Sequence, residues 1–470
     1  MSTDEGDQRR LLATCAERTG LSTDELWLRY FALGGDAGPV EVEAYLYGLL
    51  PLPAFQRDVL AHAINERLDE LDWLRRVPYS RAVRQAKPAT GPLAALVDLL
   101  DGAHRAPPER LPAVALAAGR ELGVRLEVYL VDHAQRLLVP VLSEEGRDAL
   151  AVDGTTAGRA FRAVDEVVET RDGVPRLWSV LLDGTDRLGV VEVTFADPAE
   201  ARDPNLREQC RWLCRLLGHL VVTTGKYGDG LDLPRRRSST PAVELLRDVR
   251  PPLTAGTDTV AVAGSGEPGT GAFDYALSET TAHLAIFDAG SGTPDPALVT
   301  AAALAAYRTA RRGGLPLTGQ AHAVEQELTT AFGSGRHAGG ALAELDLRTG
   351  RTRFLTAGTA RLLVVRDGGV TALDAGRRGA GFGGEAAEAV VEPGDWLLLH
   401  TGGVVGGGFG ADRLADLLGR LRTEVEPPPE AARLLLRAVL DHDGGEPRGD
   451  VTVLLAVWSG PGGPRVRLEP

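Results

Sequence analysis

The chain has 470 residues, 44% of them hydrophobic, and a formal net charge of −14. This length predicts two to four domains with packed cores, and the acidic balance argues against general nucleic-acid binding, because a phosphate backbone needs clustered cations. Cysteine occurs only at Cys15, Cys210 and Cys214, which suits a reducing cytoplasm and excludes a disulfide framework. No signal peptide and no apolar run of membrane-spanning length is found, so we expect a cytoplasmic protein that does not enter a membrane.

Residues 1–87 have the pattern of a helical module. Ser22 is followed three residues later by Glu25, which is the spacing of a capping box at a helix start. The stretch FQRDVLAHAINERLDELDWL, from residue 55, carries apolar residues at helical spacing. No residue here is typical of a catalytic site, so we expect a module for interaction or dimerisation. Proline and glycine within residues 88–106 then predict a linker.

Residues 107–225 alternate between strand and helix patterns. Two candidate strands, LEVYLVD and RLLVPVL, form an antiparallel pair around a short turn, and AGRAFRAV is a short helix. Three strands (DEVVET, LWSVLLD and LGVVEVTF) and a long helix over 203–222 follow. With GRAF and LGVVEVTF in these places, the segment resembles a GAF domain, a sensory module that binds small ligands or mediates dimers. A non-covalent small-molecule ligand and a role in protein binding alone both stay open.

Cys210 and Cys214 lie four residues apart on one face of that long helix, with His219 one turn beyond. A metal or redox pair is one interpretation, but two small packing residues are the interpretation that we prefer. A second linker is predicted over 226–255. Within it, Ser238, Ser239 and Thr240 follow three arginines, and we favour an exposed arginine-rich linker over a phosphorylation site.

Residues 256–460 contain a succession of buried or half-buried strands separated by helical stretches, and residues 461–470 form a tail. The strand candidates are VAVAG, HLAIFDAG, ALAELDL, RFLTAG, RLLVVRDGG, WLLLHTGG and VTVLLAVW. Helical patterns follow FDAGSGTPD and HTGG. This order predicts an α+β domain of two antiparallel sheets with helices outside. The whole chain is therefore expected to be a multidomain α+β protein.

Five stretches of this last domain carry a family resemblance. They are GTGAFDYAL, LAIFDAGSGTPDPALVTAAALAAYR, LDLRTGRTRFLTAGTARLLVVRDGGV, VEPGDWLLLHTGGVVGG and GGEPRGDVTVLLAVW. In this order and spacing they resemble the metal-dependent type 2C (PPM) Ser/Thr protein phosphatases, in the bacterial branch of sporulation stage II E. The resemblance covers about 200 residues. It implies a PPM-type β-sandwich flanked by helices.

The resemblance also implies a metal site. In the family, two Mg²⁺ or Mn²⁺ ions bound by strand-end aspartates share a water that attacks phosphorus. Matched to this sequence, the first aspartate falls on Gly271, the second on Asp288, the third on Gly402 and the last on Gly449. Three of the four carboxylates are therefore replaced by glycine. The strand WLLLH thus ends at Thr401 with no acidic ligand after it.

Two neighbouring acids are weaker candidate ligands. Asp450 adjoins the vacated position 449, but a one-residue step along a strand turns a side chain to the opposite face. Asp274 corresponds to a second, non-bridging acid of the family. Two dications about 4 Å apart repel by roughly 17 kcal/mol at an effective dielectric near 20, and Asp288 alone offsets little of this. We assign no cofactor, and a single Mg²⁺ or Mn²⁺ is the ion that the remaining acids suit.

Three functions follow from these patterns. The first is a pseudophosphatase, in which a catalytically impaired domain binds a phosphorylated regulator during partner switching. The family's usual substrates imply a partner of the anti-sigma-factor antagonist type. The second is an active Mg²⁺- or Mn²⁺-dependent Ser/Thr phosphatase that is regulated by the GAF-like domain, so the sequence leaves open whether the protein is an enzyme. The third is a small-molecule sensor scaffold. Apolar helical elements at both linkers favour a homodimer.

Overall fold

The computed structural model describes residues 5–71, 91–141, 147–235, 240–266, 271–290, 295–373, 379–406, 408–424, 426–444 and 449–470. The chain divides into two compact units, residues 1–88 and 89–470. In the described part of the chain, no helix has both the length and the apolar character needed to cross a bilayer. Ser238 and Ser239 lie outside the described residues.

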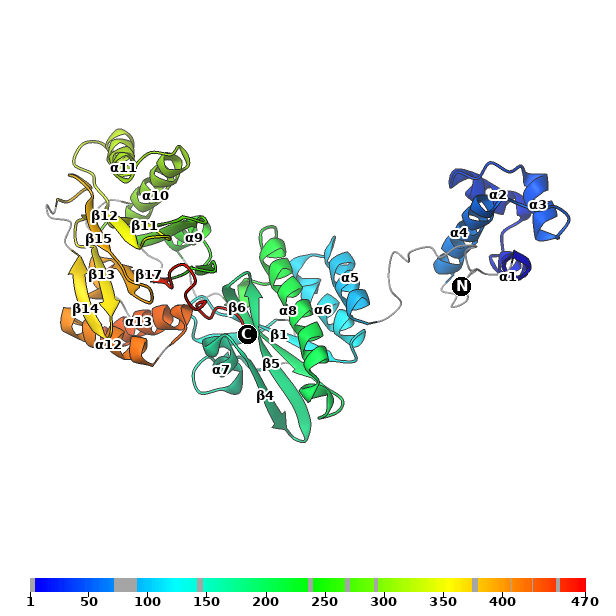
Figure 1. The fold of residues 1–470 in the computed structure, drawn as a ribbon, viewed down its shortest axis with the longest axis horizontal. Helices are drawn as coiled ribbons and strands as arrows, with labels where there is room; N and C mark the ends of the chain where they lie inside the picture. The colour runs from blue at the N-terminus through cyan, green and yellow to red at the C-terminus, as the bar shows by residue number, and fades with distance from the viewer. Residues whose placement is uncertain are drawn as a thin grey trace. The chain divides into compact units, whose positions relative to one another are not determined.

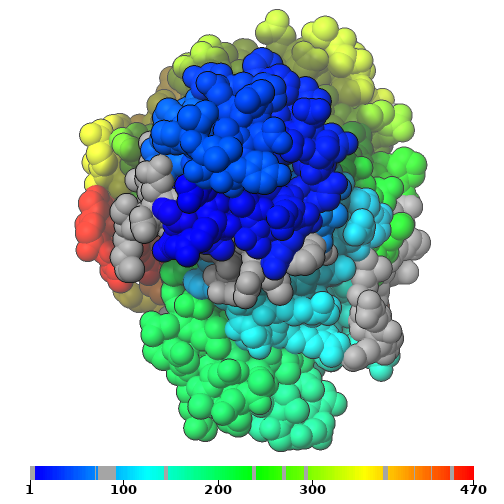
Figure 2. Space-filling model, turned by 90° about the vertical axis from the view of Figure 1, so that its right-hand side faces the viewer, coloured from blue at the N-terminus to red at the C-terminus, as the bar shows by residue number. Residues whose placement is uncertain are grey.

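The first unit is helical, as predicted. Its helices are α1 (Glu5–Arg18), α2 (Thr23–Ala32), α3 (Pro39–Leu46) and α4 (Ala54–Glu70). The capping box is confirmed, because the Ser22 hydroxyl accepts from the Glu25 N–H and the Glu25 carboxylate accepts from the Ser22 N–H. Buried side chains from all four helices, Tyr30 and Ile64 among them, form one core. Figure 2 shows this unit, in blue, as a closely packed body.

The second unit begins differently from the predicted linker over 88–106. Helix α5 (Pro92–Ala103) occupies most of that segment and is followed by α6 (Leu111–Arg120), against which it packs. Pro92 stands at the first helical position, where proline starts a helix rather than breaking one. Leu99 is fully buried in the same core as α6. Residues 92–103 therefore belong to the folded domain.

Residues 107–225 contain the predicted strand-and-helix order around one antiparallel sheet. Its elements are β1 (Arg125–Val131), β2 (Leu137–Pro140), β3 (Leu150–Ala151), α7 (Thr156–Ala163), β4 (Glu166–Arg171), β5 (Val174–Asp183), β6 (Asp186–Thr194) and α8 (Pro204–Gly225). The sheet order is β3-β2-β1-β6-β5-β4. Helices α5, α6 and α8 pack on one face, and α7 packs on the other. We call α5 to α8 with this sheet the sensor-like domain.

The C-terminal domain has two antiparallel sheets with helices outside, which confirms the predicted architecture. Its elements are α9 (Pro241–Val249), β7 (Thr254–Gly256), β8 (Val260–Gly266), β9 (Gly271–Leu277), β10 (Thr281–Asp288), α10 (Pro296–Arg312), α11 (Leu317–Phe332), β11 (Gly339–Asp346), β12 (Arg351–Ala357), β13 (Arg361–Arg366), β14 (Gly369–Leu373), β15 (Ala387–Val390), β16 (Trp396–His400), α12 (Ala411–Thr423), α13 (Pro428–His442) and β17 (Thr452–Trp458). The sheet orders are β15-β12-β11-β10-β9 and β14-β13-β16-β17-β8-β7.

Three apolar layers hold this domain together. The inner faces of the two sheets meet in a core that includes Phe273, Leu399 and Leu454. Helices α9, α10 and α11 cover the outer face of the first sheet, and α12 and α13 cover the outer face of the second (Figure 1). Residues alternate between the layers along each strand, so Phe273 points inward and Ala272 points outward. The domain is thus a helix–sheet–sheet–helix sandwich.

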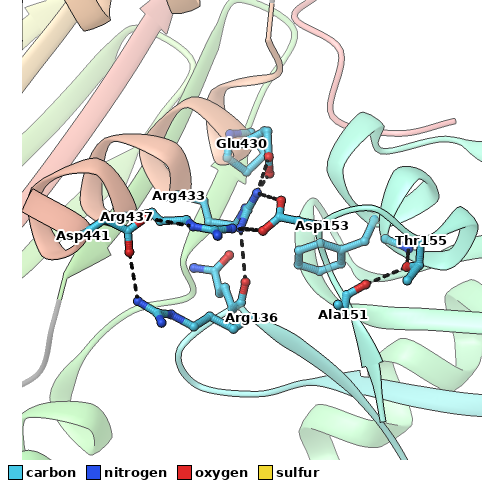
Figure 3. Close-up of polar contacts among 12 residues, drawn as sticks. Arg136, Ala151, Asp153, Thr155, Glu430, Arg433, Arg437 and Asp441 are labelled. Atoms are coloured by element: carbon cyan, nitrogen blue, oxygen red, sulfur yellow. Dashed lines mark hydrogen bonds and ion pairs between the residues drawn. The ribbon is translucent and has the colours of Figure 1, made fainter. Parts of the chain in front are cut away.

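The sensor-like and C-terminal domains share a charged, buried contact within the second unit. Arg187 of β6 lies 3.3 Å from Glu430 at the start of α13, and Arg433 lies 2.7 Å from the same carboxylate group. Arg433 also pairs with Asp153 of the sensor-like domain at 2.9 Å, and Arg437 reaches Asp153 as well (Figure 3). The contact therefore joins the start of α13 to both β6 and the loop before α7.

The last residues of the chain, predicted as a tail, pack back onto the sensor-like domain. Arg467 lies 2.5 Å from Asp165, and Arg215 of α8 lies 2.9 Å from Glu469. The side chain of Leu468 is 5% exposed. A Cβ at Gly256 would lie 2.2 Å from Leu468 Cδ1, so this leucine packs closely against β7. Residues 465–469 are therefore part of the folded unit.

Candidate functional site

The candidate site lies where strands of both sheets end. Gly271 begins β9 and is paired directly with Asp288, the last residue of β10. In the facing sheet, Thr401 follows β16 and its N–H donates to the carbonyl of Thr452 at 3.0 Å, next to Asp450. We call Gly271, Asp288, Gly402, Gly449 and Asp450 the strand-tip cluster. The sandwich thus brings together the vacated ligand positions and two acids that the sequence singled out.

Asp450 points into this cluster, against the expectation that it would face away. A Cβ built at Gly271 would lie 1.9 Å from Asp450 Oδ2, so the carboxylate fills the space of the missing side chain. The alternation rule does not apply here because β17 begins only at Thr452, after Asp450. Asp288 and Gly271 lie in register on neighbouring strands, so Asp450 and Asp288 share one small region.

The environment of Asp450 disfavours its charged form. Burial, followed by the negative charge of Asp288, raises the pKa of Asp450 to about 7, and the hydrogen bond from the Thr452 hydroxyl at 3.0 Å opposes this. Its Oδ1 is buried and has no hydrogen-bond partner among the described residues. Asp288 is better satisfied, because its Oδ1 accepts from the Gly290 N–H at 2.7 Å. The two acids therefore lie close enough for the negative charge of Asp288 to disfavour ionisation of Asp450.

The three glycines of the strand-tip cluster are not equivalent. A Cβ at Gly402 would lie 2.1 Å from Thr359 Oγ1, whereas a Cβ at Gly449 would meet nothing closer than the Gly403 Cα at 3.9 Å. Gly403 itself is tightly constrained, since a Cβ there would lie 2.0 Å from the Asp450 carbonyl oxygen. Asp450 and Thr359 thus fill the space at two vacated positions, and the third is open.

Thr401 holds this arrangement in place. It is fully buried, and its hydroxyl donates to the Asp450 carbonyl at 2.8 Å and accepts from the Thr452 N–H at 3.0 Å. The neighbouring His400 is also buried. Burial lowers the pKa of His400 to about 4, so its ring is neutral and its Nδ1 can donate to the Thr401 carbonyl at 2.8 Å. Hydroxyl and backbone groups therefore organise the strand end at which the family resemblance predicts an acid.

Asp274, the third acid that the sequence suggested, does not join the cluster. It lies three residues after Gly271 on β9 and so faces the opposite side of the sheet. There it pairs with Arg308 at 2.7 Å and Arg311 at 3.1 Å, both from α10. Its side chain is 3% exposed. Asp274 therefore anchors α10 to the sheet.

The cluster does not fit a two-metal centre. In the described part of the chain, no group of three or more His, Cys, Asp or Glu side chains could hold a metal ion. Asp288 and Asp450 supply two carboxylates, whereas the repulsion between two dications needs several shared ones. The unpartnered Oδ1 of Asp450 is the feature that would suit one Mg²⁺ or Mn²⁺, an ion that one or two carboxylates can hold with water.

The Cys210–Cys214 pair lies in a packed core, as the packing interpretation predicts. Both thiols are buried, on the side of α8 that packs against the sheet. His219 lies on the surface and pairs with Asp183 at 3.3 Å.

The sequence did not predict the side chains that fill the space at Gly271 and Gly402, which are Asp450 and Thr359. It also did not predict the Arg187–Glu430 contact. No sequence signal joins Arg187 to Glu430, which lie 243 positions apart.

Comparison with known proteins supports the fold of the C-terminal domain. Residues 278–459 match the family model of stage II sporulation protein E (SpoIIE). These residues form a SpoIIE-type domain with the fold of the PPM phosphatases, which confirms the resemblance seen in the sequence. No curated protein matched the chain.

Several solved structures are similar to part of this chain. The RsbU and RsbW domains of Rv1364c from Mycobacterium tuberculosis are 21% identical, with a TM-score of 0.39 over 43% of this chain and 62% of that one. The phosphatase domain with a regulatory fragment of SpoIIE from Bacillus subtilis is 17% identical, with a TM-score of 0.38 over 43% and 63%. The PP2C domain of SiaA from Pseudomonas aeruginosa is 24% identical, with a TM-score of 0.36 over 41% and 84%. The match spans less than two thirds of the first two chains.

Proposed function

We propose that this chain is a regulatory signalling protein whose SpoIIE-type domain has lost two-metal catalysis and acts by binding. In this proposal the domain recognises a phosphorylated regulator of the anti-sigma-factor antagonist type during partner switching. The protein works in the bacterial cytoplasm. The partner class comes from the resemblance to the family, whose usual substrates are phosphoserine or phosphothreonine on such regulators.

The occupied space at Gly271 is the observation that carries this proposal. An acidic ligand is missing opposite Asp288, and the Asp450 carboxylate fills the volume that it would need. Thr359 fills the corresponding volume beside Gly402. The two vacated positions are thus packed with other side chains, which favours a domain adapted to the loss over one that awaits a metal ligand.

Two measurements on the full chain test the proposal. Calorimetric titration with Mn²⁺ should show no site that binds two ions per chain, and a phosphoserine peptide should not be hydrolysed with Mn²⁺ present. An active type 2C phosphatase assayed in parallel controls for the substrate and the metal. Turnover that disappears in Asp288→Ala would contradict the proposal.

A second candidate is a phosphatase that works with an unusual ligand set. The proximity of Asp450 to Asp288 and the unpartnered Oδ1 of Asp450 favour it, because together they offer two carboxylates to one cation. On this alternative, Mn²⁺ binds one ion per chain and both Asp288→Asn and Asp450→Asn abolish turnover. Binding of one ion without turnover would leave the binding role as the better account.

The sensor-like domain is proposed to regulate the SpoIIE-type domain as a GAF-like module, with a small-molecule ligand or a protein partner. Support comes from its predicted element order and from the buried contact between Arg187 and Glu430. A change at the sensor-like sheet can reach α13 through that contact. The helical first unit is proposed to favour a homodimer, which sedimentation of the full chain would test against residues 89–470.

A further inference from the structure

A pocket lies between the sensor-like domain and the C-terminal domain, away from the strand-tip cluster. It encloses about 630 Å³ and is lined by α7, by the end of α12, by the starts of β16 and α13, and by residues 464–467. Trp396 forms part of its wall at the start of β16. Thr401, next to the strand-tip cluster, follows the other end of this strand, roughly 16 Å away at 3.3 Å per residue. The pocket is therefore a separate site.

Arginines outnumber acidic residues in the lining of this pocket, although the protein as a whole is acidic. Five arginines line it, against two acids, Glu424 and Glu426; the arginines are Arg159, Arg162, Arg422, Arg465 and Arg467. The chain as a whole carries a formal net charge of −14. A concave surface lined by one sign of charge concentrates ligands of the opposite sign. The pocket thus selects for anions.

Two of these arginines carry buried donors that nothing in the described part of the chain satisfies. The Nε atoms of Arg162 and Arg422 are both buried without a hydrogen-bond partner there. The Cζ of Arg422 also lies over the Trp396 ring, 5.8 Å from its centroid. Because these Nε atoms are buried, a ligand in the pocket would contact the two guanidinium groups through their other nitrogen atoms.

The remaining wall is apolar. Trp396 and Val457 come from the buried sheet, and Pro427, Pro464 and Val466 complete the surface. At the rim, Arg465 and Arg467 pair with Asp258 at 3.0 Å and Asp165 at 2.5 Å. The volume is in the range of sites for whole small molecules and exceeds what a lone phosphate fills. A fitting ligand therefore carries several anionic oxygens and an organic part.

We propose that this arginine pocket binds a small phosphorylated molecule carrying at least two negative charges, whose phosphate oxygens accept from Arg162 and Arg422. Such a ligand contacts both domains at once, because Arg162 belongs to α7 and Arg422 to α12. Its binding therefore stabilises their present arrangement. This site does not depend on whether the strand-tip cluster is catalytic.

Calorimetric titration of the full chain in EDTA tests this, with ATP and inorganic pyrophosphate as the probes. EDTA removes divalent ions, so binding through a metal at the strand-tip cluster does not contribute. We expect saturable binding of ATP with a dissociation constant below roughly 1 mM. Arg162→Gln and Arg422→Gln should each weaken it about tenfold or more, since each removes a charged hydrogen-bond donor. Arg120→Gln, an exposed arginine on α6, is the matched control and should bind as the unaltered chain does.

The probes and variants separate the outcomes. Tighter binding of ATP than of pyrophosphate identifies a ligand with an organic part, and equal binding identifies recognition of the phosphates alone. Arg162→Lys keeps the charge but loses the planar guanidinium group. Its affinity for ATP should therefore lie between those of the unaltered chain and of Arg162→Gln. Circular dichroism checks that each variant is folded, and Arg159→Gln replaces any that is not. Absence of binding by both probes, or binding that neither glutamine variant weakens, overturns the proposal.

Discussion

Arg187 and Glu430 form an ion pair between two domains, with 3.3 Å between Nη1 and Oε2 and side chains that are 3% and 0% exposed. Arg187 also donates to the Pro429 carbonyl at 2.8 Å, and Arg433 supplies a second cation to Glu430. Burying charges is costly unless every group is paired. Arg433 has a second partner in Asp153, whereas Arg187 pairs with Glu430. Glu430 therefore pairs with both buried arginines and is the central residue of this contact.

Replacing Glu430 by Gln should destabilise the second unit by about 3–5 kcal/mol, because the buried Arg187 loses its paired anion and Arg433 loses one of its two. Urea denaturation of the full chain measures the loss. Glu388→Gln is the matched control, since Glu388 pairs with Arg351 at 2.7 Å on the surface, where such pairs contribute less than about 1 kcal/mol. Equal losses in the two variants would show that the buried pair contributes no more than the exposed one.

Asp450→Asn should stabilise the protein, and more so at high pH. The folded protein holds a proton on Asp450 up to about pH 7, whereas the unfolded chain releases it near the ordinary value of 3.8. Asp450 therefore costs stability progressively as the pH rises from about 4 to about 7, and the full cost, on the order of 4 kcal/mol, is present above pH 7. The free energy of unfolding of Asp450→Asn should exceed that of the unaltered chain at pH 8 and approach it at pH 4.

Asp346→Asn is the control, because its effect on the free energy of unfolding should have the opposite sign to that of Asp450→Asn. Backbone N–H groups of Arg348 and Thr349 donate to Asp346, and the first of these lowers the pKa of Asp346 the most. Its carboxylate thus favours the fold above its ordinary pKa, and that benefit is lost as the pH falls. The Asp346→Asn variant should show no gain at pH 8. A gain equal to that of Asp450→Asn would refute the role of burial.

Gly402→Asp and Gly449→Asp should differ in stability although both restore a family aspartate. The first places a Cβ 2.1 Å from the Thr359 hydroxyl, so overpacking should cost about 1–3 kcal/mol. The second meets no atom closer than 3.9 Å, so it avoids this overpacking and should cost less than the first. Thermal unfolding of both variants gives the comparison, and adding Thr359→Ala to Gly402→Asp should recover part of the loss.

Cys210 and Cys214 should be chemically silent in the folded protein. Burial raises the pKa of Cys210 to about 12 and raises that of Cys214 further still, so both remain thiols at pH 8. Iodoacetamide should modify neither in the native chain and both in urea, as mass spectrometry of the tryptic peptides would show. Rapid native labelling, or Zn²⁺ binding at this pair, would instead favour the redox or metal interpretation.

Local patterns predicted most of the fold. The capping box at Ser22, the β1–β2 hairpin and the two sheets of the C-terminal domain follow from short-range periodicity. The missing aspartates were visible because single positions in a known order of motifs can be read directly. Helix α5 was mistaken for a linker since Pro92 suggests a break as easily as a helix start.

Long-range geometry could not be predicted in the same way. Whether Asp450 faces the cluster depends on where β17 begins, and strand limits are uncertain by a few residues in any sequence reading. The Arg187–Glu430 pair and the arginine pocket join segments that are distant in the chain, and each arginine alone resembles an ordinary surface residue. Only the packed domains reveal which charges are buried together.

The closing residues 465–469 give the molecule a topological property. The chain leaves the sensor-like domain after α8, builds the whole sandwich, and returns to Asp165 and α8 through Arg467 and Glu469. The C-terminal domain is consequently connected to the sensor-like domain at both of its ends, by the chain after α8 and by residues 465–469. A large rotation between the two domains would therefore have to break these two ion pairs and the packing of Leu468.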